Sequence, residues 1–300
     1  MENIIKCPCC LSVNVLENGQ LTDYYVSNES FQLSRCQDCG FVYTNPRPDT
    51  TEIGKYYQSA DYMSHNTSST SLFHKLYRLV RNYMYNKKLS RISAHLNRNI
   101  QASTILDYGA ASGDFLSYCI SRGVTQVSGV EPDATCRKIA LEQHGVFLKS
   151  VKELPDFKDA AFDVITLWHV LEHVHNLDET IRNFYDKLNE KGVLVISVPN
   201  IDALDCKIYK EYWSAYDVPR HLYHFNTKTI STLMDRHGFK LDKTYPLMFD
   251  SYYISLHSEW YMKTGKLSAI LRAIKNGFLS NFSARKTNNY SSLIYIFTKN

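Results

Sequence analysis

Between residues 103 and 245, short apolar runs alternate with helical patterns, and this alternation constrains the fold more than any other feature of the chain. Each interval between two strand-like runs is long enough for a helix, which is the pattern of a parallel sheet wrapped by helices. The sequence therefore predicts an α/β fold with a seven-strand sheet. The expected strands are 104–107, 126–131, 146–149, 162–167, 193–198 and 239–245, with a last strand in the run SSLIYIF at 291–297.

The run ILDYGAASGDF has the pattern of a strand that ends at Asp107, followed by a turn of small residues and a helix. Gly109, Ala111 and Gly113 let the backbone approach a ligand, and the start of the helix offers unpaired N–H groups. A dinucleotide fingerprint would need glycine where this chain has alanine and aspartate, so a pyrophosphate site fits poorly. The second strand ends at Glu131, where a carboxylate can accept both hydroxyl groups of a ribose.

Four segments, LDYGAASGDF, VSGVEPD, FDVITLWHVLEHV and GVLVISVPN, in that order and spacing, resemble the class I S-adenosylmethionine-dependent methyltransferases. The resemblance covers nearly the whole chain. It implies a Rossmann-like seven-strand methyltransferase sheet with helices on both faces and S-adenosylmethionine as methyl donor. Ala111 and Ser150 depart from the family pattern, which has a second glycine and often an adenine-binding aspartate there. The donor-binding residues that the resemblance implies are Asp107, Gly109, Gly113 and Glu131, and the further cofactor-binding candidates are Ala111, Pro132, Ser150 and His169.

Two CxxC pairs lie near the start of the chain, Cys7 with Cys10 and Cys36 with Cys39. Their spacing is close to that of a zinc ribbon, in which two knuckles supply four thiolates. Such a closed site would hold the fold together and would not catalyse, while Cys9 is expected to be a bystander. Reduced cysteines without metal are the alternative. The arrangement resembles the zinc-ribbon leader of bacterial methyltransferases that modify glycans and deoxysugars.

The segment YWSAYDVPRHLYHFN, residues 212–226, gathers aromatic, histidine and arginine side chains after the fifth strand. Aromatic faces stack on sugars, and an imidazole can take up a proton near neutral pH. The segment is similar to the HxxYFS segment of deoxysugar C-methyltransferases, whose histidine is catalytic. That match falls on His221, with His224 and Tyr223 as further catalytic candidates. The alternative is that these residues only cap a helix that begins near Thr227.

The string HVLEHV places His169, Glu172 and His173 after the fourth strand. Together with His221 these residues could bind a divalent cation, and small-RNA 2′-O-methyltransferases use a similar ExxEH string. The alternative is that His169 lines the pocket of the methyl donor.

We expect three regions, with the boundaries set by composition and pattern. Residues 1–50 form the zinc-ribbon leader, and 51–102 form a basic helical linker or lid. Residues 103–300 form the methyltransferase domain, with insertions at 200–227 and 246–290.

The charge is distributed unevenly along the chain. The net charge of +4 is too small to indicate a nucleic-acid partner by itself, yet 62–106 and 260–300 contain no acidic residue. Helical spacing of apolar residues is expected from 72 to 96 and from 267 to 278. A basic amphipathic helix can lie on an anionic membrane surface or can pack on the core, and both interpretations stay open.

The expected function is methyl transfer to a sugar or other small glycan-pathway acceptor, either soluble or lipid-linked. The alternatives are a ribosomal or other RNA methyltransferase whose zinc ribbon binds substrate, and a non-catalytic scaffold that binds the donor. Because no apolar run approaches the roughly 20 residues of a membrane span and the start has no signal-peptide pattern, we expect a cytoplasmic protein.

Overall fold

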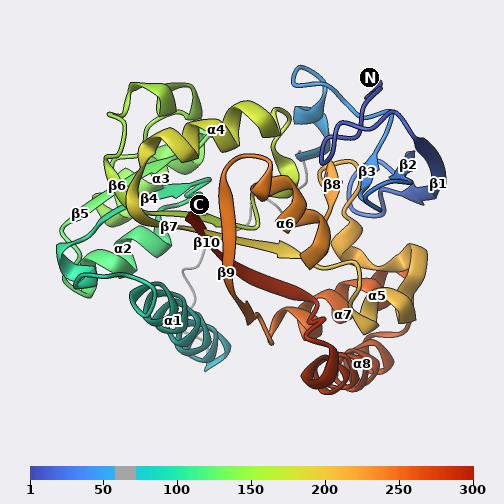
Figure 1. Cartoon of the computed structure of the whole chain (residues 1–300). Coiled ribbons are helices and arrows are strands. Elements are labelled where there is room, and N and C mark those ends of the chain that lie inside the picture. Colours follow the sequence, from blue (N-terminus) through green and yellow to red (C-terminus); the bar gives the residue numbers. More distant parts are fainter. Residues whose placement is uncertain (58–71) are drawn as a thin grey trace.

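The computed structural model describes residues 1–57 and 72–300. Within the helical linker, side chains are described for 51–57 and from residue 79 onward. Part of the expected linker, 58–71, therefore lies outside the described residues. The described chain forms a six-stranded sheet in the order β5-β4-β6-β7-β10-β9 and a smaller four-stranded sheet (Figure 1). The strands of the large sheet are β4 Thr104–Tyr108, β5 Gln126–Val130, β6 Phe162–Trp168, β7 Leu188–Pro199, β9 Phe239–Pro246 and β10 Ser292–Lys299.

The large sheet is parallel from β5 to β7, while β10 runs antiparallel between β7 and β9. The sequence predicted this α/β class correctly. The expected strand at 146–149 is not formed in the described chain, which has six strands in this sheet. Only Lys149 bridges to Val130, because the segment leaves the end of one helix at Gly145 and enters the N-cap of the next at Ser150.

Helices cover both faces of the sheet. Side chains of α4 (Leu177–Lys187) and α6 (Thr227–Asp235) share one buried cluster with the sheet. The opposite face packs against α1 (Leu72–Ser93), α2 (Asp114–Ser121) and α3 (Ala134–His144). In α1, Leu89 and Ile92 are buried whereas Leu79 and Tyr83 are exposed, so the C-terminal half carries the packing. The first part of the expected apolar face, at 72–78, has no described side chains.

The small sheet combines the cysteine-bearing leader with a distant segment. Its order is β1-β2-β3-β8, built from β1 Val15–Thr22, β2 Ser30–Cys36, β3 Val42–Thr44 and β8 Tyr223–His224. Val42 pairs with His224, and Tyr43 pairs with Tyr223. The segment that carries the catalytic candidates therefore completes the sheet of the leader (Figure 1).

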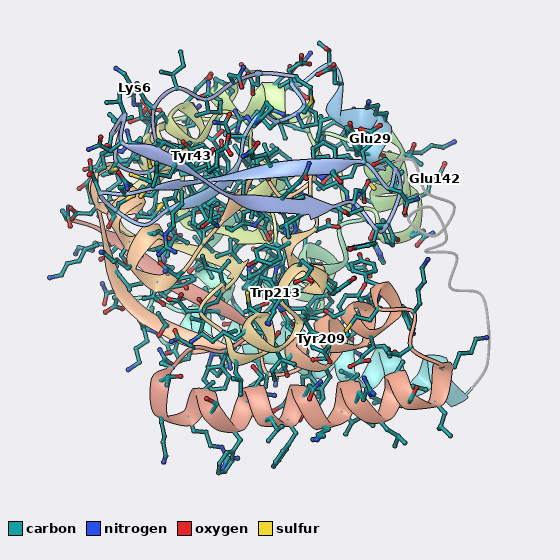
Figure 2. The ribbon with its side chains drawn as sticks, turned by 90° about the vertical axis from the view of Figure 1, so that its right-hand side faces the viewer. Lys6, Glu29, Tyr43, Glu142, Tyr209 and Trp213 are labelled. Atoms are coloured by element: carbon teal, nitrogen blue, oxygen red, sulfur yellow. The ribbon has the colours of Figure 1, made fainter. Side chains whose placement is uncertain are left out.

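Three helices from the two expected insertions gather at the end of the molecule below the small sheet (Figure 1). They are α5 (Leu204–Tyr209), α7 (Asp250–Tyr261) and α8 (Lys266–Thr287). In Figure 2, Tyr209 and Trp213 lie between the leader, marked by Tyr43, and α8. Among the described helices, none has the length and apolarity that a membrane crossing requires.

Candidate functional site

The turn after β4 brings backbone against the loop that follows β6. Gly109 has a φ of +75°, and a Cβ atom built there would lie 2.5 Å from a methyl carbon of Val170, so only glycine fits. Ala111 also has a positive φ, +47°, in the position where the sequence departs from the second glycine of the family pattern. Gly113 then caps the start of α2. The turn therefore keeps the shape expected of a glycine-rich loop despite the alanine.

Asp107 is buried at the end of β4, where its Oδ1 accepts a hydrogen bond of 2.6 Å from the Thr166 hydroxyl. Burial raises the pKa of Asp107 to about 7, although the Thr166 hydrogen bond and the charge of Lys88 oppose this rise. Lys88 comes from α1, and its Nζ lies 3.9 Å from the ring centroid of Trp168. Burial lowers the pKa of Lys88 to about 8. No sequence motif contains Lys88, so its place in the site is seen only in the folded chain.

Glu131 joins the two loops at the ends of β4 and β5. Its carboxylate accepts the backbone N–H of Ala111 at 2.9 Å and that of Asp133 at 3.0 Å. Each oxygen keeps a second lone pair. Burial raises the pKa of Glu131 despite these hydrogen bonds. The carbonyl groups of Glu131 and Pro132 both accept from Arg137, which fixes the turn, while Ser150 caps the next short helix beside it.

His169 follows β6 with a φ of +56° and stands between two carboxylates. Its Nε2 lies 3.1 Å from Asp250 Oδ2, and its Nδ1 lies 3.4 Å from Glu172 Oε1. Burial disfavours the imidazolium, but the two carboxylates raise the pKa of His169 to about 9. Asp250 begins α7, so the second insertion reaches this loop. Sequence reasoning missed Asp250 because it lies far along the chain and in no motif.

The ring of His221 is oriented by a hydrogen bond from Nδ1 to a backbone carbonyl group, which leaves Nε2 available. Its Nδ1 lies 2.8 Å from the carbonyl oxygen of Ala215, which can only accept, so Nδ1 carries a proton. In the neutral ring the lone pair is then on Nε2, which lies 3.9 Å from Asp217 Oδ2. The ring packs edge-on against His173 with centroids 4.6 Å apart. Burial and the nearby charge of His221 lower the pKa of His173 to about 4.

Glu172 is fully buried beside the two imidazoles, and neither of its carboxylate oxygens has a hydrogen bond. One ligand atom each of Glu172, His173 and His221 lie within 4.8 Å of one another. The structure thus brings together three of the four residues named for a divalent cation, while His169 is outside this group. One carboxylate and two imidazoles are a donor set that transition metals accept, and the cation site stays a hypothesis.

The other two catalytic candidates face the leader. His224 is buried in β8, and burial together with the charge of His221 lowers its pKa to about 3. The Tyr223 hydroxyl accepts a hydrogen bond of 2.6 Å from Arg47 and donates one of 3.1 Å to the carbonyl oxygen of His175. Of the three catalytic candidates, His221 is the one whose ring nitrogen lies in the group with Glu172 and His173.

The four cysteines of the CxxC pairs converge. Their Sγ atoms all lie within 4.8 Å of one another, with Cys7 to Cys39 at 3.6 Å and Cys10 to Cys36 at 3.5 Å. A tetrahedral zinc ion with Zn–S bonds of about 2.3 Å would place its sulfur ligands about 3.8 Å apart, so this donor set fits zinc. Cys9 is not in this group of four, and its Sγ donates to the carbonyl oxygen of Thr229 at 3.3 Å.

Part of this chain is similar in sequence to known proteins. Ubiquinone biosynthesis O-methyltransferase of Rickettsia akari is 25% identical over 158 residues, 51% of this chain and 61% of that protein. The mitochondrial ubiquinone biosynthesis O-methyltransferase of Saccharomyces cerevisiae is 32% identical over 123 residues, 38% of each chain. The chain therefore spans less than two thirds of the length of these relatives.

Two solved structures show the same fold at low identity. Magnesium protoporphyrin IX methyltransferase from Synechocystis PCC 6803 has a TM-score of 0.50 and 12% identity, covering 82% of this chain and 92% of that one. Geranyl diphosphate C-methyltransferase from Streptomyces coelicolor A3(2) has a TM-score of 0.50 and 13% identity, covering 81% and 90%. A family model described as a methyltransferase domain matches residues 75–244, more than half of the chain. The protein with this glycine turn, buried Asp107 and loop-joining Glu131 belongs to the methyltransferase-domain family.

Proposed function

We propose that this protein transfers the methyl group of S-adenosylmethionine to a hydroxyl group of a sugar or other small glycan-pathway acceptor, with His221 as general base. One observation carries the proposal: Glu172 touches both halves of the site. On one side it approaches His169, which follows β6 beside the glycine turn, and on the other it lies in a group with His221. Because Glu172 lies beside both His169 and His221, the base and the donor-binding residues can act on the same acceptor atom.

The residues around the glycine turn fit S-adenosylmethionine. The positive φ angles of Gly109 and Gly113 shape the turn after β4, and Glu131 beside it has one free lone pair per oxygen for the ribose hydroxyls. Lys88 and Asp107 offer opposite charges for the carboxylate and amino group of the methionine part. When bound, S-adenosylmethionine supplies a methyl group on a positively charged sulfur, which leaves as a neutral thioether.

The acceptor step needs a proton acceptor and accurate alignment. The hydroxyl oxygen would bond to the methyl carbon as the carbon–sulfur bond breaks with its electron pair going to sulfur, and the hydroxyl proton would pass to Nε2 of His221. The buried carboxylate of Glu172 then stabilises the imidazolium. Alignment can be worth an effective molarity of about 10⁵ M or more, and a general base adds about 10²- to 10⁴-fold.

We propose a structural zinc ion in the leader, held by Cys7, Cys10, Cys36 and Cys39. All four positions of the ion would be filled by thiolates, so it would not bind substrate. Its role would be to hold β2 and β3 together. β8 pairs with β3. In this way the zinc site would hold the segment that carries His221.

A second acceptor class is a phenolic hydroxyl group. The relatives that match this chain are named as ubiquinone biosynthesis O-methyltransferases, which favours oxygen as the accepting atom and adds aromatic acceptors to sugars. The same base and donor pocket would serve either acceptor. The rings of Trp213, Tyr223 and Phe225 in the 212–226 segment are buried, so they do not favour a sugar over a phenol.

The test is a transfer assay with methyl-labelled S-adenosylmethionine and three acceptor sets: nucleotide-linked sugars, lipid-linked sugars and catechols. Each reaction is followed by release of S-adenosylhomocysteine and by mass spectrometry of the product. A methyl ether on a sugar supports the proposal, and a methylated catechol supports the second class. If the protein binds the donor but methylates none of them, the non-catalytic scaffold is favoured.

A further inference from the structure

Helix α8 exposes its large apolar side chains and buries its small and polar ones, the reverse of an ordinary surface helix. The face that packs inward carries small and polar residues, and a Cβ at Gly277 would lie 2.7 Å from the Tyr252 ring of α7. The inward residues are Ala269, Ala273, Gly277, Ser280, Asn281 and Ala284. The large apolar side chains point to solvent, and they are Leu267, Ile270, Leu271, Ile274, Phe278, Leu279 and Phe282.

The exposure of this apolar face is extensive. Leu267 is 73% exposed, Leu271 61% and Phe278 56%, and the rings of Phe278 and Phe282 stack with centroids 6.2 Å apart. A helix of 22 residues at about 1.5 Å per residue is about 33 Å long. Figure 2 shows α8 running along the lower edge of the molecule, with no described element beyond it. Large contiguous apolar surface of this kind marks a contact site.

The exposed charges of α8 itself are all positive, and one of them, Arg272, lies 4.0 Å from the buried carboxylate of Glu259. From Trp260 to the last residue the sequence contains no aspartate or glutamate. Six basic side chains on α8 and just before it are exposed: Lys263, Lys266, Arg272, Lys275, Arg285 and Lys286. Two copies of the chain that met through this face would place these cations against one another. An anionic surface complements them.

We infer that the outer face of α8, defined by the seven apolar residues above, binds the surface of an anionic lipid membrane. Apolar side chains would enter the boundary between headgroups and acyl chains, and the basic residues would contact anionic headgroups. The helix would lie in the plane of the surface, because it is amphipathic and its inward face packs on α7 and α5. Each basic residue near such a surface adds about fivefold to the affinity.

The same face is close to the proposed site, and this step rests on the proposed function. Asp250, at the start of α7, reaches His169, while the residues immediately before it, Met248 and Phe249, are exposed. A protein docked through α8 would therefore hold the loop after β6 within one helix layer of the lipid. This arrangement selects the lipid-linked form of the acceptor over the soluble form.

The experiment is co-sedimentation of the full chain with vesicles of phosphatidylcholine, with and without phosphatidylglycerol, at low and high salt. We expect binding to the anionic vesicles at low salt and a large loss at high salt. The double variant Phe278→Ser/Phe282→Ser should lose at least tenfold in affinity. Phe147→Ser is the matched control, because Phe147 is 71% exposed on another part of the surface and should leave binding unchanged.

Three results would overturn the inference. They are no sedimentation with anionic vesicles at low salt, equal sedimentation of the double variant, or a wild-type dimer in sedimentation velocity that becomes a monomer in the double variant. The last result would assign the face to a second copy. Methyl transfer measured without vesicles on soluble acceptors reports on the proposed function separately, so either proposal can fail alone.

Discussion

The guanidinium group of Arg220 donates a hydrogen bond of 2.9 Å to the carboxylate of Asp23, a residue 197 positions away in the cysteine-bearing leader. Both side chains are buried, and Arg220 also binds Asp217 and the carbonyl oxygen of Tyr56. With nearly all of its donors occupied, Arg220 fastens the loop before His221 to the leader. The leader is thus a structural part of the candidate site.

The Asp23→Ala variant should be strongly destabilised. It would leave the buried charge of Arg220 without one partner, and removing one member of a buried ion pair costs about 3–5 kcal/mol. Asp23 also accepts hydrogen bonds from the backbone of Tyr25 and Ser27, which would be lost. Urea denaturation measures the change in the free energy of unfolding. Asp38→Ala, at an exposed position in the leader, is the control, and a loss below 1 kcal/mol at Asp23 would contradict the structural role.

The turn after β4 and the convergence of the four cysteines could be predicted from the sequence because both are local. A strand, a small-residue turn and a helix succeed one another between Thr104 and Ser121, and the next strand ends just before Glu131, so the places of Gly109 and Glu131 follow from the pattern itself. The zinc-binding pattern is similar, since CxxC pairs place two ligands each through one tight turn. These features depend on short-range geometry and could be predicted.

The remaining features depend on long-range packing. No local pattern says that Tyr223 and His224 add a strand to the leader, because a two-residue strand has no periodicity. Lys88 and Asp250 reach the site from α1 and α7, and only the assembled fold shows this. The outward apolar face of α8 was also hidden, because helical spacing identifies a stripe without saying whether the core or the solvent side receives it.

Glu131→Ala should weaken binding of S-adenosylmethionine at least tenfold. The variant loses one or two hydrogen bonds between a charged acceptor and the ribose, each worth roughly 1.5–3 kcal/mol. It also frees the N–H groups of Ala111 and Asp133, so thermal melting is measured beside calorimetric affinity. Glu142→Ala on the exposed side of α3 serves as control. Unchanged affinity at Glu131 would remove it from the donor site.

One zinc ion per chain is expected in protein purified without chelator, as elemental analysis would show. Cys36→Ser should lose the metal and, because β8 pairs with the leader, should lower turnover as well as leader stability. Cys9→Ser should keep the metal, since Cys9 is outside the convergent group of four cysteines and its Sγ donates to the carbonyl oxygen of Thr229. Full turnover by a zinc-free Cys36→Ser protein would refute the link to His221, and wild-type protein without stoichiometric zinc would refute the metal site.

Stability should fall as pH rises from 6.5 towards 9, in part through His169. Its pKa is raised from the ordinary 6.5 to about 9, so the folded state favours the imidazolium. The stabilisation is complete below pH 6.5 and is lost as pH passes through about 9. Because 36% of the side chain is exposed, solvent screens the ion pairs and we expect about 1 kcal/mol.

Urea denaturation across this pH range checks that expectation. His169→Gln should remove the His169 contribution, and Asp250→Asn should shrink it by removing one of the two carboxylates. Identical pH dependence of unfolding in wild type and His169→Gln would show that the His169 ion pairs contribute nothing.

The His221→Asn variant should keep its fold and its affinity for S-adenosylmethionine while turnover falls by about 10²- to 10⁴-fold. The asparagine amide can still donate to the carbonyl oxygen of Ala215, as Nδ1 does, but it offers no basic nitrogen. His224→Asn is the comparison and should cost less, because His224 contacts Thr44 in the leader sheet. Two results would contradict the base assignment: normal turnover of His221→Asn, or a wild-type rate lost on dialysis against chelator and restored by a divalent cation other than zinc. The second result would make Glu172, His173 and His221 cation ligands instead.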